Sequence, residues 1–304
     1  MPESLRRVLA AARGADAGPG TGRALLVPGV GTPLEAHAAA AAGFEAVYVS
    51  GYATAAWRHG VPDIGLIAFG EISDALTAVT DVVDLPVVVD ADTGYGDVVN
   101  VARTVRLLEA RGASAVQLED QTWPKRCGHL RGKSVEPLDV MVRKIAAAAS
   151  SRVDDETMII ARTDARATDG LEAAIARARA YVEAGADAIF VDAPESEAEL
   201  AEIAASVAAP LVANMSESGL TPMLPRERFD ELGYAIVLYP TSSLRVASRA
   251  FARFFADLRE HGDSSRWLDD MSSLGELNAL VGLAEAEALE ARVTEATATE
   301  VADD

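Results

Sequence analysis

The segment Asp90-Ala91-Asp92 places two carboxylates two residues apart where a short apolar run ends. Residues i and i+2 of a strand point to the same side, so we expect both carboxylates to face one end of that strand. Such a pair suits a hard dication that prefers oxygen ligands, Mg²⁺ above all, with Mn²⁺ as a substitute. Glu119 and Asp120 close the next apolar run, and either can add a ligand directly or through water. The alternative role for Asp92 is the N-cap of a following helix.

The only cysteine of the chain lies in the pentapeptide Lys125-Arg126-Cys127-Gly128-His129. Neighbouring cations favour the thiolate, and a loop that contains glycine and proline keeps the sulfur accessible. Cys127 can therefore serve as an acid in proton transfer, with His129 setting its protonation state. The alternative is an inert, buried cysteine. A zinc site is disfavoured because one cysteine and one histidine lack two further ligands.

Arg162 ends another apolar run and is followed by Thr163 and Asp164. A guanidinium group binds a carboxylate through two parallel hydrogen bonds, so Arg162 is a candidate for gripping an acidic substrate. An ion pair with a neighbouring carboxylate is an equally good interpretation, and the two roles are compatible.

Four further candidates lie in the second apolar run or after it. Ser50 and Gly51 end it, and they offer a hydroxyl group and a backbone that a ligand can approach closely. Tyr48 lies two residues before Ser50 and shares its face. Asp63 is a further candidate. Its place between Pro62 and Ile64, close to Gly65, is equally typical of a residue in a turn.

These residues are distributed along a repeating pattern of elements. Eight short apolar runs contain no polar alternation, which indicates parallel strands buried on both faces. Alanine-rich segments with helical spacing separate them, and several end in a glycine before the next run. The runs are 24–28, 46–50, 86–90, 115–119, 157–162, 188–192, 210–214 and 235–239. Eight such units predict a (β/α)8 TIM barrel, with a doubly wound open sheet as the alternative.

The barrel prediction has a consequence for the polar residues. Catalytic groups of such barrels lie at the carboxyl ends of the strands. Six of the runs end in residues able to do chemistry, and we expect them to converge on one rim. They are Ser50, Asp90, Glu119, Arg162, Asp192 and Asn214.

Two segments fall outside the repeat. Residues 120–137 form a long basic insertion after the fourth run, which is typical of a lid or a binding loop. The chain ends in a helical tail, so we expect a barrel domain over residues 1–260 and extra C-terminal helices over 261–304. The apolar face of the tail can pack on a neighbouring subunit or on its own barrel.

Composition limits the partners. The chain has 304 residues, of which 47 are acidic and 27 basic, for a formal net charge of −20. This acidity disfavours nucleic acid and anionic membranes, and no apolar run is long enough to span a bilayer. One cysteine forms no internal disulfide, which favours a reducing compartment. We therefore expect a cytoplasmic protein with a small-molecule ligand.

Taken together, the motifs resemble those of the isocitrate lyase / phosphoenolpyruvate mutase superfamily. They are KRCGH, DADTGYG, LEDQ, IIARTDA, VSG followed by PDIG, and ANMSESGLTP, and the resemblance runs from Leu25 to Phe251. The loop sequence HLRGK resembles the corresponding loop of one branch of the superfamily, which contains oxaloacetate hydrolase, dimethylmalate lyase and petal death protein. The superfamily also contains 2-methylisocitrate lyase, which the chain resembles as well.

The resemblance implies a TIM barrel whose last helix is swapped between subunits, a tetramer, and Mg²⁺ held by Asp90, Asp92 and Glu119. It implies that Cys127, with His129 beside it, protonates a departing carbanion, and that Tyr48 and Asp63 lie near the hydroxyl group that loses its proton. The residues expected to contact the substrate are Ser50, Gly51, Tyr52, Lys125, Arg126, Gly128, Arg162, Asp192 and Asn214.

The activity implied is a Mg²⁺-dependent carbon–carbon lyase. It would cleave a 2-hydroxy di- or tricarboxylate, such as 2-methylisocitrate, an alkylmalate or an oxaloacetate-like acid, to an oxo-acid such as pyruvate. Cys127 favours a lyase over a phosphonomutase or phosphonopyruvate hydrolase, which are the enzyme alternatives. A non-catalytic barrel that binds an oxo-acid is the third possibility. Asp192 stands where relatives usually carry Glu, which leaves the substrate open.

Overall fold

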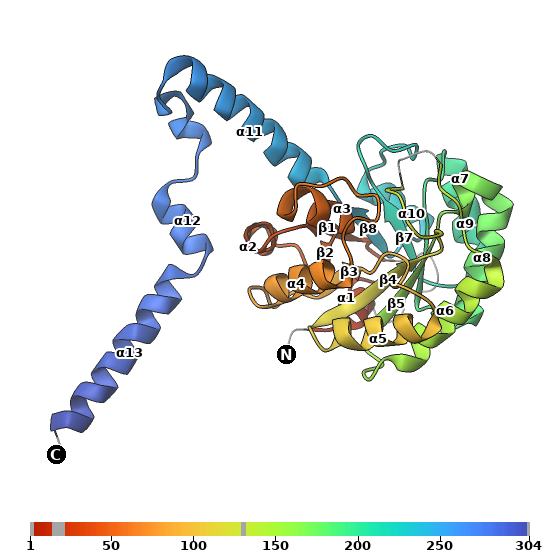
Figure 1. Ribbon diagram of the computed structural model, residues 1–304, viewed down its shortest axis with the longest axis horizontal. Coiled ribbons are helices and arrows are strands. Elements are labelled where there is room, and N and C mark those ends of the chain that lie inside the picture. Colours follow the sequence, from red (N-terminus) through yellow and green to blue (C-terminus); the bar gives the residue numbers. More distant parts are fainter. Residues whose placement is uncertain (1–2, 14–21, 129–131, 303–304) are drawn as a thin grey trace. The chain divides into compact units, whose positions relative to one another are not determined.

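The computed structural model describes residues 3–13, 22–128 and 132–302 (Figure 1). Eight parallel strands follow one another around a closed barrel, and β1 pairs with β8 to complete it. This confirms the predicted TIM barrel and excludes the open sheet. The strands are β1 (Leu25–Val30), β2 (Val47–Val49), β3 (Val87–Asp90), β4 (Ala113–Glu119), β5 (Met158–Thr163), β6 (Ala188–Val191), β7 (Leu211–Asn214) and β8 (Ile236–Tyr239).

Helices connect the strands on the outside of the barrel. Thr32 and Glu35 form a capping box at the start of the first of them, and Gly43 ends it with a left-handed φ of +81°. The main connecting helices are α2 (Pro33–Ala41), α4 (Phe69–Thr80), α5 (Val98–Glu109), α6 (Leu138–Ser151), α8 (Leu171–Glu183), α9 (Glu197–Ser206) and α10 (Arg226–Leu232). Short helical turns are α3 (Gly51–Ala53), a π-helical turn (Thr54–Arg58) and α7 (Ala165–Asp169).

Side-chain alternation along the strands explains where the polar residues lie. The apolar cluster inside the barrel contains Val88, Ile160 and Val212. Two residues further along each strand the side chain points the same way, which brings polar groups to the mouth of the barrel. The groups reached in this way are Asp90, Arg162 and Asn214. Pairing of β4 with β5 then sets Glu119 directly beside Arg162.

A helix that the sequence analysis did not predict closes the opposite end. Helix α1 (Leu5–Arg13) buries Leu5, Val8 and Leu9 in the same apolar cluster as the inward side chains of the strands. Arg6 pairs with Asp187 at 2.8 Å, which fixes the helix to the β6 end of the barrel. The interior is therefore a packed core sealed at the amino ends of the strands.

The chain divides into two compact units, Met1–Arg245 and Val246–Asp304. The boundary lies inside helix α11 (Ser242–His261). The second unit continues with a 3-10 turn (Ser265–Asp270), α12 (Leu274–Leu280) and α13 (Leu283–Ala302). Among the residues described, no helix has both the length and the apolar character to cross a bilayer.

The second unit has little core of its own. Trp267 packs edge-on against Phe254 at 5.6 Å between ring centroids, and its indole donates to Asp257 at 3.1 Å. Phe255 and Leu274 are exposed, so the packing within this unit leaves large apolar side chains uncovered.

Replacing Leu5 with alanine tests the sealing role of α1. Leu5→Ala leaves a cavity among fully buried side chains, so the free energy of unfolding should fall by about 2–5 kcal/mol. The matched control Val99→Ala alters a side chain that is 81% exposed and should change it by less than about 0.5 kcal/mol. Urea denaturation of the full chain measures both values, and equal effects would contradict the packing of α1.

Candidate active site

A small cavity of about 50 Å³ lies at the carboxyl ends of the strands. Twelve of the residues singled out from the sequence line it: Tyr48, Ser50, Tyr52, Asp63, Asp90, Glu119, Lys125, Arg126, Cys127, Gly128, Arg162 and Asn214. His129 lies outside the described residues. Phe190 and Leu238 supply an apolar wall that was not predicted from the sequence, where their only signal was their place in strands.

Asp90 and Asp92 do converge, but not by strand alternation. Strand β3 ends at Asp90, and Asp92 adopts a left-handed φ of +47°, so the predicted i, i+2 geometry is wrong in its detail. A Cβ atom added to Gly51 would lie 2.9 Å from Asp90 Oδ2 and 3.4 Å from Asp92 Oδ1, which places both carboxylates on one side. The N-cap of α5 is Asp97, which rules out that role for Asp92.

Lys125 is buried among these carboxylates. Its Nζ lies 2.6 Å from Asp63 Oδ1 and 2.7 Å from Asp92 Oδ1. Burial by itself lowers the pKa of Lys125, but the carboxylates around it, led by Asp92 and Glu119, raise that pKa well above its usual value. Lys125 therefore stays charged, and Asp63, which lies in a bend of the chain, is its buried ion-pair partner.

Asp92 is an unusual carboxylate because no part of it is exposed. Burial, with repulsion from Asp90 and Asp63, raises the pKa of Asp92 to about 7, although Lys125 acts in the opposite direction. Its Oδ2 atom has no hydrogen-bond partner among the described residues. An acceptor of this kind is costly to bury unless a cation or a donor completes it.

Glu119 and Asp120, which the sequence left as equal candidates, have different roles. Glu119 points to the cavity, its Oε1 has no partner among the described residues, and burial raises its pKa well above the usual value. Asp120 accepts hydrogen bonds from Thr163 Oγ1 at 2.7 Å and from the Tyr181 hydroxyl at 2.7 Å. Asp120 is therefore fully used in joining β5 to α8, and Glu119 is the carboxylate available at the site.

Arg162 forms the cationic centre of the opposite wall. It donates to both oxygens of Asp164, at 2.9 and 3.0 Å, and its Nη2 lies 3.2 Å from Asp192 Oδ2. Its Nε also lies 3.3 Å from Glu119 Oε2, and the guanidinium stacks over Phe190. The ion-pair interpretation is thus correct, and it holds the guanidinium in a fixed orientation at the cavity.

Lys133 and Asp164 belong to this network and were not singled out as site residues from the sequence. Lys133 Nζ lies 2.7 Å from Asp164 Oδ1 and 3.2 Å from Asp192 Oδ2, so it ties the loop after β4 to β5 and β6. The position of Asp164 two residues after Arg162 was the available signal. For Lys133 the sequence offered only its place in the basic loop.

The backbone of the loop is pressed against these charges. Cys127 N donates to Asp63 O at 3.1 Å, and Cys127 is partly buried at the cavity. A Cβ atom on Gly128 would lie 2.5 Å from Asp192 Oδ2 and 2.6 Å from Arg162 Nη2. Only glycine fits at this position while the ion pairs stay in place.

The remaining predicted residues have more local partners. Ser50 Oγ accepts from Ala53 N at 3.2 Å and caps α3. The Tyr48 hydroxyl accepts from Gln117 Nε2 at 3.0 Å, while burial and the nearby Asp90 raise the pKa of Tyr48 well above its usual value. Tyr52 is 37% exposed, and Asn214 Oδ1 has no partner among the described residues.

Negative charge exceeds positive charge at this mouth. Six carboxylates with little or no exposure (Asp63, Asp90, Asp92, Glu119, Asp164 and Asp192) surround three cations (Lys125, Lys133 and Arg162). Within the described residues no three Asp, Glu, His or Cys side chains are arranged to hold a metal ion by themselves. The donors that could contribute to a metal site are carboxylate oxygens, led by the two without partners on Asp92 and Glu119.

A parallel eight-stranded barrel with a buried, charged cavity at the carboxyl ends of its strands is the architecture of a TIM-barrel enzyme. The family model that matches residues 21–259 is described as phosphoenolpyruvate phosphomutase. The chain belongs to this family, as the motifs in its sequence indicated.

Named relatives agree with this assignment. The 2-methylisocitrate lyase of Bacillus subtilis (strain 168) is 45% identical over 88% of this chain and 87% of its own length. The 2,3-dimethylmalate lyase of Eubacterium barkeri is 41% identical over 86% of this chain and 91% of its own length.

Solved structures share the whole fold. Oxaloacetate acetylhydrolase in complex with the inhibitor 3,3-difluorooxalacetate has a TM-score of 0.89 at 31% identity, and the match covers 96% of each chain. Phosphonopyruvate hydrolase in complex with oxalate and Mg²⁺ has a TM-score of 0.84 at 29% identity, covering 95% of this chain and 99% of that one.

The raised pKa of Asp92 predicts a pH dependence of stability. The folded state holds a proton on Asp92 between about pH 4 and pH 7, where the unfolded chain has lost it. The free energy of unfolding should therefore fall as pH rises through this window, by up to about 1.4 kcal/mol per pH unit. Asp92→Asn should remove this contribution. Urea denaturation with a chelator present measures the slope.

The control for that experiment is Asp139→Asn, because the Asp139 side chain is 72% exposed and its pKa is lowered by its hydrogen bond from Arg143. Asp139→Asn should keep the wild-type slope between about pH 5 and pH 7. Equal slopes in Asp92→Asn and wild type would contradict the titration assigned to Asp92.

The packing of Gly128 makes a second prediction. Gly128→Ala should push the loop away from Asp192 and Arg162, so the rate at which an aromatic disulfide reagent modifies the single cysteine should rise several-fold. Gly70→Ala is the control, since no atom lies within 4 Å of its added Cβ. An unchanged rate in Gly128→Ala would show that the loop tolerates a side chain here.

Proposed function

We propose that this protein is a Mg²⁺-dependent carbon–carbon lyase that cleaves a 2-hydroxy di- or tricarboxylate to an oxo-acid such as pyruvate. The observation that carries the proposal is one cavity lined by Arg162, by the Asp90 and Glu119 carboxylates, and by the loop with Cys127. The lyases among the relatives support the same class, at 45% and 41% identity over most of the chain.

The magnesium ion would be held by Asp90, Asp92 and Glu119, in part through water. Oxygen atoms without partners on Asp92 and Glu119, together with the excess of buried negative charge, fit a hard dication. Fewer than three directly bound side chains suffice, because magnesium keeps several waters and is completed by substrate oxygens. When bound, the ion supplies a Lewis acid for the oxygen of the oxo-acid that forms. Mn²⁺ would substitute on the same ligands.

The residues of the chain supply the other functions of a retro-aldol cleavage. Arg162 would grip a substrate carboxylate through its guanidinium group, which its own ion pairs hold in place. Asp63 would accept the hydroxyl proton, and Tyr48, whose raised pKa keeps it protonated, would orient that oxygen. The bond between the two carbons then breaks, and its electron pair stays on the leaving carbon. Cys127 would protonate that carbon and become a thiolate.

The cavity also indicates what must move for the substrate to bind. Its volume of about 50 Å³ is room for a few water molecules. Substrate would therefore enter by displacing Lys125 or Gly128, with its own carboxylates and the metal replacing the present ion pairs. The remaining contacts would come from Ser50, Gly51, Tyr52, Arg126, Asp192 and Asn214.

Chemistry at a carbon–phosphorus bond is the second candidate. The family description and the phosphonopyruvate hydrolase structure favour it, although that structure is only 29% identical to this chain.

We further propose a homo-oligomer, a tetramer, in which a neighbouring subunit covers the exposed apolar side chains of the second unit. The lone cysteine supports a cytoplasmic location.

A substrate panel tests the proposed reaction. Purified protein with Mg²⁺ should release pyruvate, glyoxylate or another small oxo-acid or carboxylate from 2-methylisocitrate, a 2-alkylmalate or oxaloacetate. Removal of the metal by a chelator should abolish release, and added Mg²⁺ should restore it. Turnover of phosphonopyruvate alone would replace the lyase with the second candidate.

Cys127→Ser tests the proton donor within the same assay. The variant should lose turnover by at least about 100-fold, because serine is a far weaker acid, yet still bind oxalate in the presence of Mg²⁺. Val99→Ala, at an exposed helix position, should retain full turnover. Full activity in Cys127→Ser would rule out the thiol as the acid.

A further inference from the structure

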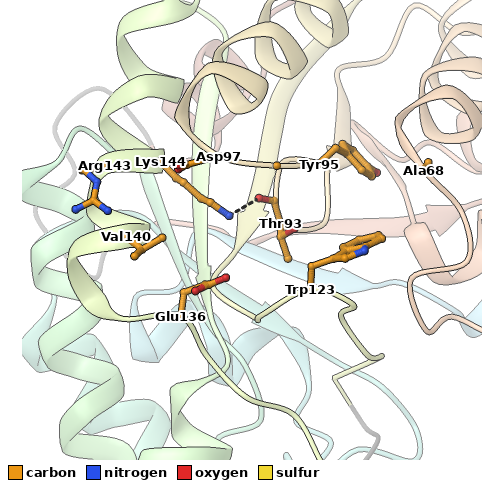
Figure 2. Close-up of a pocket in the computed structure, with 10 residues that line it drawn as sticks. Ala68, Thr93, Tyr95, Asp97, Trp123, Glu136, Val140, Arg143 and Lys144 are labelled. Carbon is orange, nitrogen blue, oxygen red and sulfur yellow. Dashed lines mark hydrogen bonds between the residues drawn. The ribbon is translucent and has the colours of Figure 1, made fainter.

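A second, larger cavity of about 600 Å³ lies outside the barrel mouth (Figure 2). Its walls come from the loop after β3, the loop after β4 and helix α6, and none of its lining residues belongs to the cavity described above. This volume falls within the range of sites that bind small organic molecules. The proposed lyase reaction makes no use of it.

Lys144 forms the polar base of this cavity. The residue is 6% exposed, and Figure 2 shows its ammonium group directed at the carbonyl of Thr93, to which it donates at 3.3 Å. No carboxylate of the described residues lies within 4 Å of Lys144 Nζ, in contrast to the buried Lys125. Burial lowers the pKa of Lys144, and the more distant Glu136 and Asp97 oppose this only in part. An ammonium with one neutral partner has donors left for an anion.

Two aromatic rings form the opposite wall. Tyr95 and Trp123 pack edge to face with 6.5 Å between ring centroids, and Tyr95 packs in the same way on Phe69 at 5.9 Å. Tyr95 is held in a left-handed φ of +60°, and Trp123 is 47% exposed, so a large apolar surface faces the cavity. Figure 2 shows both rings across the cavity from Lys144. A flat apolar group would gain contact area there.

The other charged residues narrow the choice of ligand. Arg143 pairs with Asp139 at 2.6 Å and its side chain is 56% exposed, so Lys144 is the buried cation of the lining that has no carboxylate partner. Glu136 and Asp97 also line the cavity and would repel a second negative charge. The lining thus favours a single anionic group joined to an apolar body and disfavours the di- and tricarboxylates proposed for the active site.

We propose that this cavity is a second binding site, which takes a small monocarboxylate with a flat apolar or aromatic group. The carboxylate would bind Lys144 Nζ, and the flat group would pack on Tyr95 and Trp123. The site is separate from the lyase reaction, so it stands whether or not that reaction is correct.

Phenylacetate is the probe for this site, and phenylacetamide is its neutral match in shape. Titration calorimetry on the full-length protein, with Mg²⁺ and oxalate present to occupy the active site, should give saturable binding of phenylacetate at about 1 mM or tighter. Phenylacetamide should bind at least tenfold more weakly, because it cannot pair with the ammonium. A crystal soaked with the probe should show it between Lys144 and Trp123.

Two variants and a control locate the contacts. Lys144→Met keeps the length of the side chain and should weaken phenylacetate binding at least tenfold without affecting phenylacetamide. Trp123→Ala should weaken both compounds. Arg228→Gln should leave both affinities within about twofold, since that guanidinium lines neither cavity.

Three results would overturn the proposal. The first is equal affinity for acid and amide in the unaltered protein, a comparison that needs no variant to fold. The second is displacement of phenylacetate by oxalate, which would place the probe in the active site. The third is a crystal structure in which another part of the chain or a second copy fills the cavity.

Discussion

The organisation of the barrel mouth depends on one electrostatic constraint, which is that more negative than positive charge is buried there. Carboxylates that leave water lose hydration, and only opposite charges, hydrogen bonds or protonation compensate for it. Lys125 reaches Asp63 and Asp92, while Arg162 and Lys133 share Asp164 and Asp192. Burial, together with repulsion from the neighbouring carboxylates, raises the pKa of Asp92 to about 7 and that of Glu119 well above its usual value. The barrel mouth therefore has a deficit of positive charge, which a bound cation would reduce.

The loop after β4 connects this electrostatic constraint to chemistry. Lys125, Cys127, Gly128 and Lys133 lie within nine residues, so the segment that carries the thiol also carries two of the three buried cations. The ion pairs of the loop therefore fix the position of the thiol as well. An acidic ligand that replaced a carboxylate in one of those pairs would also move the thiol.

The cavity at Lys144 is close in the chain to the charged residues of the barrel mouth. Lys144 donates to the carbonyl of Thr93, the residue after Asp92. Burial, together with the nearby Asp92 carboxylate, raises the pKa of Tyr95 well above its usual value. The turn from Asp92 to Gly96 thus lines the second cavity and also carries Asp92, the carboxylate that pairs with Lys125. It carries left-handed conformations at Asp92 and Tyr95, so its shape is set by the packing on both sides.

The sequence by itself determined the eight strands, the barrel and the polar residues at the strand ends. Continuous apolar runs and two-residue alternation are local properties, and they bring Asp90, Glu119, Arg162 and Asn214 to one rim. The sequence did not determine the choice between Glu119 and Asp120, the partners of Lys125 or the closure of the barrel by α1. Those depend on which residues meet across long separations, such as Asp120 with Tyr181, and on how much water is excluded when they do. Only the tertiary structure decided them, because charge pairing and burial belong to the folded arrangement and not to any stretch of chain.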